Sequence, residues 1–226
     1  MKIQFEKYNQ GNYLGLILLH IIMGFVIYVY EPLGKVIFLV LVAYFTGRII
    51  LSNESNKTRE VLLGCAYFVG AEVLFRMTRS AISYEATKYL VILFMLMGIF
   101  YKGLSGKGYV YFIYLIILVP AVVVASVTLT FDANFRTNIA FVLTGPVCLG
   151  IAALFCYDRR VDSKLLMDIM LYISLPTIAL TTYIFFYAPS VKDLLTNTAS
   201  NSAVSGGFGP NQVATALGLG MVAMIV

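Results

Sequence analysis

Predominantly apolar runs, each close to the length of a membrane-crossing helix, follow one another along most of this chain of 226 residues. A helix that crosses the hydrocarbon core of a bilayer, about 30 Å thick, needs about 20 mostly apolar residues. Charges and turn residues separate the runs, so we expect a helix in each. The seven runs cover residues 13–30, 33–51, 61–75, 89–101, 109–129, 138–157 and 165–187. The fourth run is short, and we expect it to gain a turn from the preceding SYEATK.

The composition is typical of an integral membrane protein. Hydrophobic residues make up 60% of the chain and charged residues 12%, whereas soluble domains average about 45–50% apolar and about 25% charged residues. The net charge is +5, but the basic residues lie singly between apolar runs and form no stripe that would bind nucleic acid. The sequence therefore predicts an all-α, polytopic transmembrane helix bundle, with the lipid bilayer and no nucleic acid as a partner.

After the seventh run come a polar connection, residues 188–212, and a last apolar run, residues 213–226. At 1.5 Å per residue this last run reaches only about 21 Å, too short for a crossing. We therefore expect residues 1–226 to form a single transmembrane domain, the N-terminal part of a longer protein, with seven full spans and a truncated eighth.

Lysine and arginine predict the orientation, because they are in excess on the cytoplasmic side of membrane proteins. If the N-terminus is cytoplasmic, ten lie on the inner side: Lys2, Lys7, Arg48, Lys57, Arg59, Lys102, Lys107, Arg159, Arg160 and Lys164. Six lie on the outer side: Lys35, Arg76, Arg79, Lys88, Arg136 and Lys192. We therefore expect a cytoplasmic N-terminus, with the 188–212 connection facing outward.

Charged residues in the third run are the first candidates for a site. Glu72, Arg76 and Arg79 are spaced i, i+4 and i+7, which predicts that they share one face near the outer end of a helix. A charge in a membrane helix is costly and often marks a functional path. In one interpretation Glu72 pairs with Arg76 and the arginines extend to the interface. In the other, Arg76 and Arg79 clamp an anionic head group, since guanidinium groups bind phosphate oxygens in a bidentate fork.

Other residues with reactive side chains predict no metal centre and no cofactor. His20, the only histidine, lies in the middle of the first run, and we expect it to be hydrogen-bonded to a neighbour rather than catalytic. The three cysteines Cys65, Cys148 and Cys156 lie inside apolar runs without metal-site spacing.

The stretch SGGFGPNQ, residues 205–212, interrupts this apolar sequence just before its last run. Glycine allows positive φ and a close approach of the backbone, and proline suits the first turn of a helix. We therefore expect a helix to begin at about Pro210, with its N-terminus at the outer surface, where free N–H groups and the helix dipole would attract an anion. The candidate binding residues here are Gly206, Gly207, Gly209, Pro210, Asn211 and Gln212.

Two stretches resemble segments of the O-antigen ligase and O-antigen polymerase superfamily. SGGFGPNQVATALGLG, residues 205–220, is similar to the start of that family's shared region, in which an outward loop with glycine and Pro-Asn re-enters the membrane as an apolar helix. GAEVLFRMTRSAISYEATKY, residues 70–89, looks like the third-helix segment of ligase-like members. Seven helices and a cytoplasmic N-terminus agree with the topology of such proteins.

The resemblance implies a metal-independent glycosyltransferase in the bacterial inner (cytoplasmic) membrane. It would move a glycan from undecaprenyl diphosphate to a lipid A core on the periplasmic side, or to another repeat unit in a polymerase. Arg76 and Arg79 would stabilise the departing diphosphate, residues 206–212 would shape the pocket, and Asn211 would donate a hydrogen bond. In the family a catalytic histidine lies in a large outward loop downstream of this region. We therefore expect the general base beyond residue 226 and no activity from residues 1–226 alone.

Two alternatives belong to other classes of protein. A transporter would bind an anionic substrate at the N-terminus of a broken helix near GFGP. A structural membrane subunit would use the outward polar segment only as a linker.

Overall fold

The computed structural model of the protein describes residues 10–128, 135–187, 205 and 207–225. Within these ranges the fold is all-helical and contains no strand. The fold-class prediction is confirmed to that extent. The elements are α1 (Gln10–Val29), α2 (Pro32–Leu51), α3 (Lys57–Met77), α4 (Ala86–Lys102), the 3₁₀ turn η1 (Gly106–Gly108), α5 (Tyr109–Thr128), α6 (Phe135–Cys156), α7 (Ser163–Tyr187) and α9 (Pro210–Ile225).

Among the described residues, three helical segments are long and apolar enough to cross a membrane: Pro32–Leu51, Gly106–Val124 and Ser163–Tyr187. Shorter apolar helices cover Tyr13–Val29, Val142–Cys156 and Pro210–Ile225. The protein is therefore a membrane protein whose helices associate with the lipid bilayer. α3 is less apolar, but most of its residues are buried by neighbouring helices. It can therefore carry charges that a lipid-facing helix would not tolerate.

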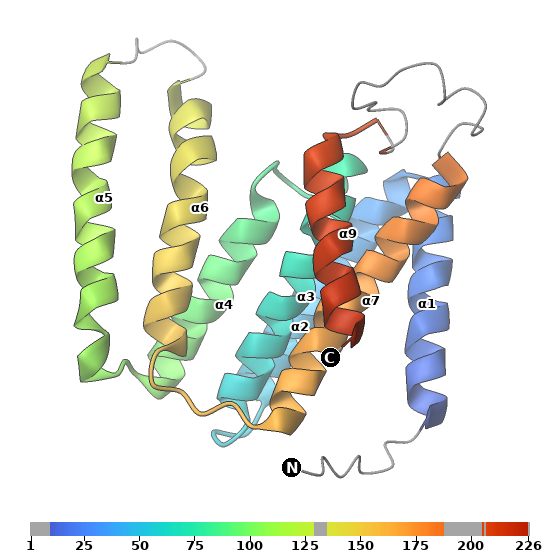
Figure 1. Ribbon diagram of the computed structural model, residues 1–226, viewed down its shortest axis with the longest axis horizontal. Helices are drawn as coiled ribbons and strands as arrows, with labels where there is room; N and C mark the ends of the chain where they lie inside the picture. Colours follow the sequence, from blue (N-terminus) through green and yellow to red (C-terminus); the bar gives the residue numbers. More distant parts are fainter. Residues whose placement is uncertain (1–9, 129–134, 188–204, 206, 226) are drawn as a thin grey trace.

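Successive helices run in opposite directions, which gives the bundle two ends (Figure 1). α1, α3, α5 and α7 finish at the upper end of this view, where α2, α4, α6 and α9 begin. α3 and α7 pack against each other at the centre, with α1, α4 and α9 around them. α5 packs against α6 on one side of the bundle.

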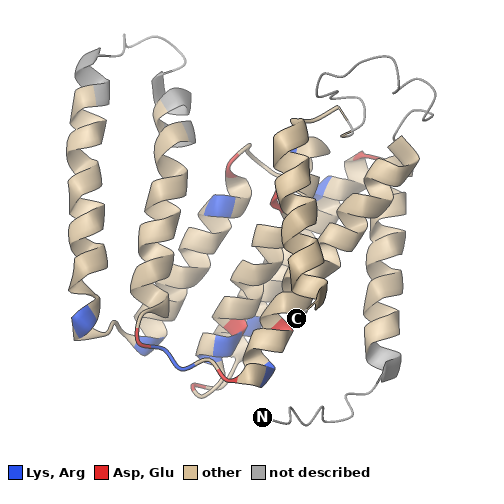
Figure 2. Cartoon of the chain, viewed as in Figure 1, with Lys and Arg blue, Asp and Glu red and all other residues tan. Residues whose placement is uncertain are grey.

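Charged residues lie mainly near the two ends of the bundle, and the helices between are almost free of them (Figure 2). Arg48 lies in the last turn of α2 and Lys102 in that of α4, both at the lower end. Arg76 lies in the last turn of α3, at the upper end. The helix directions thus bring the described basic residues of each predicted side to a common end.

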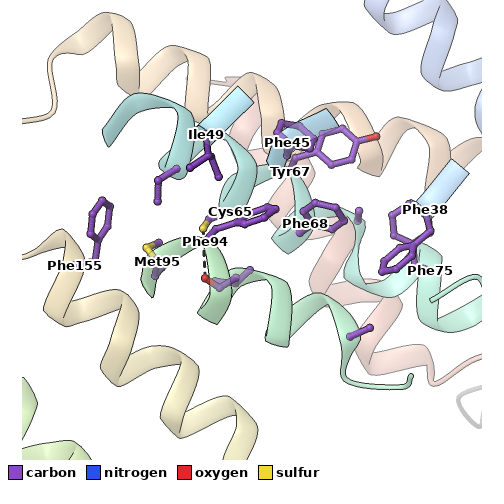
Figure 3. Packing of buried hydrophobic residues seen from close by; sticks show 14 residues of the cluster. Phe38, Phe45, Ile49, Cys65, Tyr67, Phe68, Phe75, Phe94, Met95 and Phe155 are labelled. Carbon is purple, nitrogen blue, oxygen red and sulfur yellow. Dashed lines mark hydrogen bonds between the residues drawn. The ribbon is translucent and has the colours of Figure 1, made fainter. Parts of the chain in front are cut away.

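The core is built mainly from aromatic side chains of α2, α3 and α4 (Figure 3). Phe68 lies among Phe38, Phe45 and Phe94, with ring centroids 5.8 to 6.0 Å apart in edge-to-face arrangements. Phe155 joins this cluster from α6. Edge-to-face aromatic pairs have defined geometry, so this cluster fixes α3 against α2 and α4. It thereby positions the charged last turn of α3.

Candidate functional site

Arg76 is the centre of an ion-pair network at the upper end. One of its terminal nitrogens donates to Glu72 at 2.8 Å, and the other lies 3.4 Å from Glu85. Lys88 lies 2.7 Å from Glu85 and 3.8 Å from Glu72. The side chains of Arg76 and Glu85 are each only 7% exposed, and the guanidinium of Arg76 stacks over the ring of Tyr84 at 3.7 Å. Two positive and two negative charges therefore balance within this network.

The helical spacing predicted the Glu72–Arg76 pair correctly, but its extension to Arg79 is wrong. α3 ends at Met77, and Arg79 has a φ of +51°. The amide of Ser80 donates to the carbonyl of Phe75, and the amide of Arg79 to that of Arg76. This is a Schellman closure, which requires a left-handed residue at the position of Arg79. Arg79 is therefore exposed, off the face of Arg76, and forms no ion pair with any described residue.

A groove between α3 and α9 brings the two predicted segments together. It has a volume of about 360 Å³ and is lined by Glu72 and Arg76 of α3 and by Asn211 and Gln212 of α9, among others. Arg76 and Asn211 are far apart in the sequence, so only the packing of α9 onto α3 makes them neighbours. The side chain of Arg76 is buried, and its Nε atom has no hydrogen-bond partner in the described structure.

α9 begins where the sequence predicts, but its first turn is a weaker anion site than the sequence suggests. The helix begins at Pro210, as predicted. Gly207 has a φ of +76°, which explains the need for glycine there. The amides of Gln212 and Val213 already donate to the carbonyl of Gly209. Since Pro210 has no N–H, the first turn offers fewer free donors to an anion than expected.

The remaining glycines of the motif are Gly206 and Gly209. Gly209 lines no groove, and a side chain there would meet only Gln212, at ordinary distances. Gly206 lies outside the described residues.

A second hollow, an apolar crevice of about 440 Å³, lies between α3, α4, α6 and α7. Val69 and Glu72 line both the groove and the crevice, so the two meet on α3. Hydrophobic residues dominate its walls, and Glu72, Thr87 and Lys88 are the polar and charged side chains among them. Together the two hollows offer polar and charged groups next to a hydrocarbon-lined space.

Sequence reasoning missed Glu85, Thr87 and Lys88. All three lie in SYEATK, residues 83–88, for which the only expectation was an extra turn of the fourth helix. α4 indeed begins at Ala86, inside that stretch. One signal could have indicated this cluster: charged residues stand at the start of an apolar helix, and the preceding helix carries charges of opposite sign.

A second charge network, also missed, lies at the lower end. Arg48 of α2 lies 2.7 Å from Glu60 of α3, and Arg59 lies 2.8 Å from Asp168 of α7. Arg48 also donates to the hydroxyl of Tyr172 at 2.9 Å. These contacts join three helices, and Glu60 Oε1 accepts hydrogen bonds from both Arg48 and Arg59. We regard this network as structural.

His20 is buried and hydrogen-bonded, as predicted. Its Nδ1 lies 2.8 Å from the carbonyl of Leu16 and its Nε2 lies 3.1 Å from the hydroxyl of Tyr67. A carbonyl can only accept, so in the neutral ring Nδ1 donates to Leu16 and Nε2 accepts from Tyr67. Among the residues that the structure covers, no group of three or more histidine, cysteine or acidic side chains could hold a metal ion.

Comparison with profiles of known families, with curated protein sequences and with solved structures finds no match for this chain.

Proposed function

We propose that this protein belongs to an O-antigen ligase-like glycosyltransferase that moves a glycan from undecaprenyl diphosphate to a lipid A core. In this proposal seven helices span the bacterial inner membrane fully, and the N-terminus is cytoplasmic. The upper end then faces the periplasm. The observation that carries the proposal is the groove in which Arg76 lies with Asn211 and Gln212.

The chemistry is a substitution at the anomeric carbon of the donor. The acceptor hydroxyl forms a new bond to that carbon, and the bond to the lipid diphosphate breaks with its electron pair on the diphosphate oxygen. The proton of the hydroxyl passes to a general base, for which the family resemblance implies a histidine in a large outward loop. Positive groups that lie where negative charge develops lower the barrier to such a step.

Arg76 supplies that positive charge by releasing one of its present partners, Glu72, and binding the diphosphate instead. Glu72 is 24% exposed and holds Arg76 at 2.8 Å, so a diphosphate oxygen in the groove competes with it for the guanidinium. Glu72 keeps Lys88 at 3.8 Å as a partner when it is displaced. The unpartnered Nε of Arg76 is a further donor.

The crevice next to the groove suits the lipid part of such a donor. A polyprenyl chain needs an apolar path from the bilayer to the reacting diphosphate. Val69 and Glu72 border both hollows, so a lipid in the crevice would present its head group to Arg76.

The test replaces groove residues in the full-length protein, in cells that lack the native gene. Asn211 and Gln212 are exposed, so Asn211→Ala and Gln212→Ala should leave the fold intact. Each loses a hydrogen bond to a charged group, which predicts a fall of about tenfold or more in glycan transfer. Lys35→Gln is the matched control, because Lys35 is exposed and does not line the groove.

The readouts are accumulation of the undecaprenyl-linked glycan and loss of surface polysaccharide. Long unattached polymer that still forms indicates a ligase, and its absence indicates a polymerase of the same superfamily. Normal transfer in cells without the gene would refute both assignments. Uptake of an anionic solute that depends on the gene would instead support a transporter.

A further inference from the structure

Thr87, the second residue of α4, carries a buried hydroxyl without a partner. The residue is 1% exposed, and its Oγ1 has no hydrogen-bond partner in the described structure. Threonines elsewhere in the bundle behave differently. The hydroxyls of Thr177, Thr181, Thr182 and Thr215 each donate to a backbone carbonyl three or four residues earlier.

The position of Thr87 explains the difference. It lies too close to the start of α4 to find a helical carbonyl one turn back, because the residues before Ala86 are not helical. A buried hydroxyl without a partner destabilises a fold, and natural proteins have few of them. The unpartnered hydroxyl of Thr87 therefore indicates a partner that is absent from the protein itself.

The surroundings of Thr87 indicate what that partner is. Thr87 lines the apolar crevice together with Lys88 and Glu72. Lys88 is the positively charged side chain on the crevice wall, and it belongs to the network in which Arg76 and Lys88 balance Glu72 and Glu85. A hydrocarbon-lined space with donors and positive charge at one point matches a lipid with an anionic head group.

We propose that Thr87 is a substrate-binding residue that donates its hydroxyl to a diphosphate oxygen of the lipid-linked donor. This rests on the proposed function, and it adds a residue from α4 to a site otherwise formed by α3 and α9. The hydrocarbon chain lies in the crevice between α3, α4, α6 and α7. The diphosphate lies beside Glu72, with Thr87 on its crevice side and the free Nε of Arg76 on its groove side.

Rotation of the Thr87 side chain makes this contact possible. Threonine in a helix divides between two χ1 rotamers, one of them held by a bond from Oγ1 to a carbonyl three or four residues earlier, and Thr87 makes no such bond. The hydroxyl can therefore turn toward the crevice without movement of the backbone.

The test uses purified full-length protein in detergent micelles and three variants. Thr87→Val keeps the shape and removes the hydroxyl, and Thr87→Ser keeps the hydroxyl. Thr181→Val is the matched control, since Thr181 has an internal partner and lines a different hollow. The probe is farnesyl diphosphate, compared with farnesol, inorganic diphosphate and phosphatidylglycerol. Binding is measured by titration, and unfolding temperature is measured without probe.

We expect farnesyl diphosphate to bind the wild type more tightly than any of the other three probes. Thr87→Val should weaken that binding about tenfold, because a hydrogen bond to a charged group is lost. Its unfolding temperature should stay equal or rise, because an unpartnered buried hydroxyl is removed. The affinity of Thr87→Ser for farnesyl diphosphate should lie within about threefold of that of the wild type. Thr181→Val should bind it with the wild-type affinity.

Three results would overturn the proposal: unchanged binding by Thr87→Val, a lower unfolding temperature for that variant, or equal affinity for phosphatidylglycerol. A lower unfolding temperature would mean that the hydroxyl has a partner within the protein. If Thr87-dependent binding is found but the glycan-transfer assay is negative, the binding site stands without the transferase. If Thr87→Val transfers glycan at the wild-type rate, the transferase stands without this site.

Discussion

Gly70 lies in the contact between α3 and α7, one residue from the Val69 that lines both hollows. A Cβ atom at this position would overlap the backbone carbonyl oxygen of Ile173 and lie 2.9 Å from Cγ of Pro176. Both belong to α7. The Ile173 carbonyl is part of a helix backbone and cannot rotate away, so Gly70→Ala requires α3 and α7 to move apart.

The size of the effect follows from the geometry. Carbon and carbonyl oxygen normally approach to about 3.3 Å, so the two helices must separate by about 1 Å. A gap of that size forfeits a quarter to a half of each dispersion contact at the interface. Overpacking typically costs about 1–3 kcal/mol, against a gain of about 1 kcal/mol in helix propensity. Because neither helix backbone can yield locally, we take the upper part of that range, about 2–3 kcal/mol, and expect a net loss of about 1–2 kcal/mol.

The assay is thermal unfolding of the protein in detergent, followed by circular dichroism because these 226 residues contain no tryptophan. For a protein of this size the expected loss lowers the unfolding temperature by roughly 2–8 °C. Gly47→Ala is the matched control. Gly47 lies inside α2, and a Cβ there meets no atom within 4 Å, so this variant should gain about 1 kcal/mol. An unfolding temperature for Gly70→Ala at or above that of the wild type would refute the reasoning.

Three further predictions concern the charged residues and use the same unfolding assay. Arg79→Gly should raise the free energy of unfolding by about 1 kcal/mol, because glycine adopts the left-handed conformation without strain; a decrease would contradict this. Glu60→Gln should lower the free energy of unfolding by about 2–3 kcal/mol, since this buried carboxylate contacts two arginines. Glu54 is 69% exposed, so Glu54→Gln should lower it by under about 1 kcal/mol; equal effects would count against a stabilising role of the lower network. Arg76→Leu should lower the free energy of unfolding by about 3 kcal/mol, because it leaves the buried carboxylate of Glu85 without its arginine. The double variant Arg76→Leu/Glu85→Leu removes that carboxylate as well and should lose less; additive losses would show that the pair is not coupled.

Local patterns in the sequence predicted the local structure well. The proline of GFGP marked the first residue of α9, and the i, i+4 spacing predicted the contact between Glu72 and Arg76. Both depend on residues within one helical turn. The helical nature of the fold follows from the apolar runs, because hydrogen bonds inside each segment satisfy the backbone in lipid.

Features that depend on tertiary packing were not predictable in the same way. The helical spacing continued to Arg79, but the Schellman closure turned the chain out of α3 at a residue that is not glycine. Glu85 contacts Arg76 only because the connection after α3 folds back at the upper end. The groove itself exists because α9 packs beside α3, which no sequence pattern in either helix indicates.

The central claim is that the groove between α3 and α9 binds the lipid diphosphate. Photo-cross-linking tests it most directly, with full-length protein in membranes and a polyprenyl diphosphate that carries a diazirine next to the diphosphate. Peptide mapping should find the label in residues 69–76 of α3 and 211–219 of α9, with excess unlabelled lipid diphosphate suppressing it. Labelling confined to α5 or to the lower ends of the helices would contradict the account.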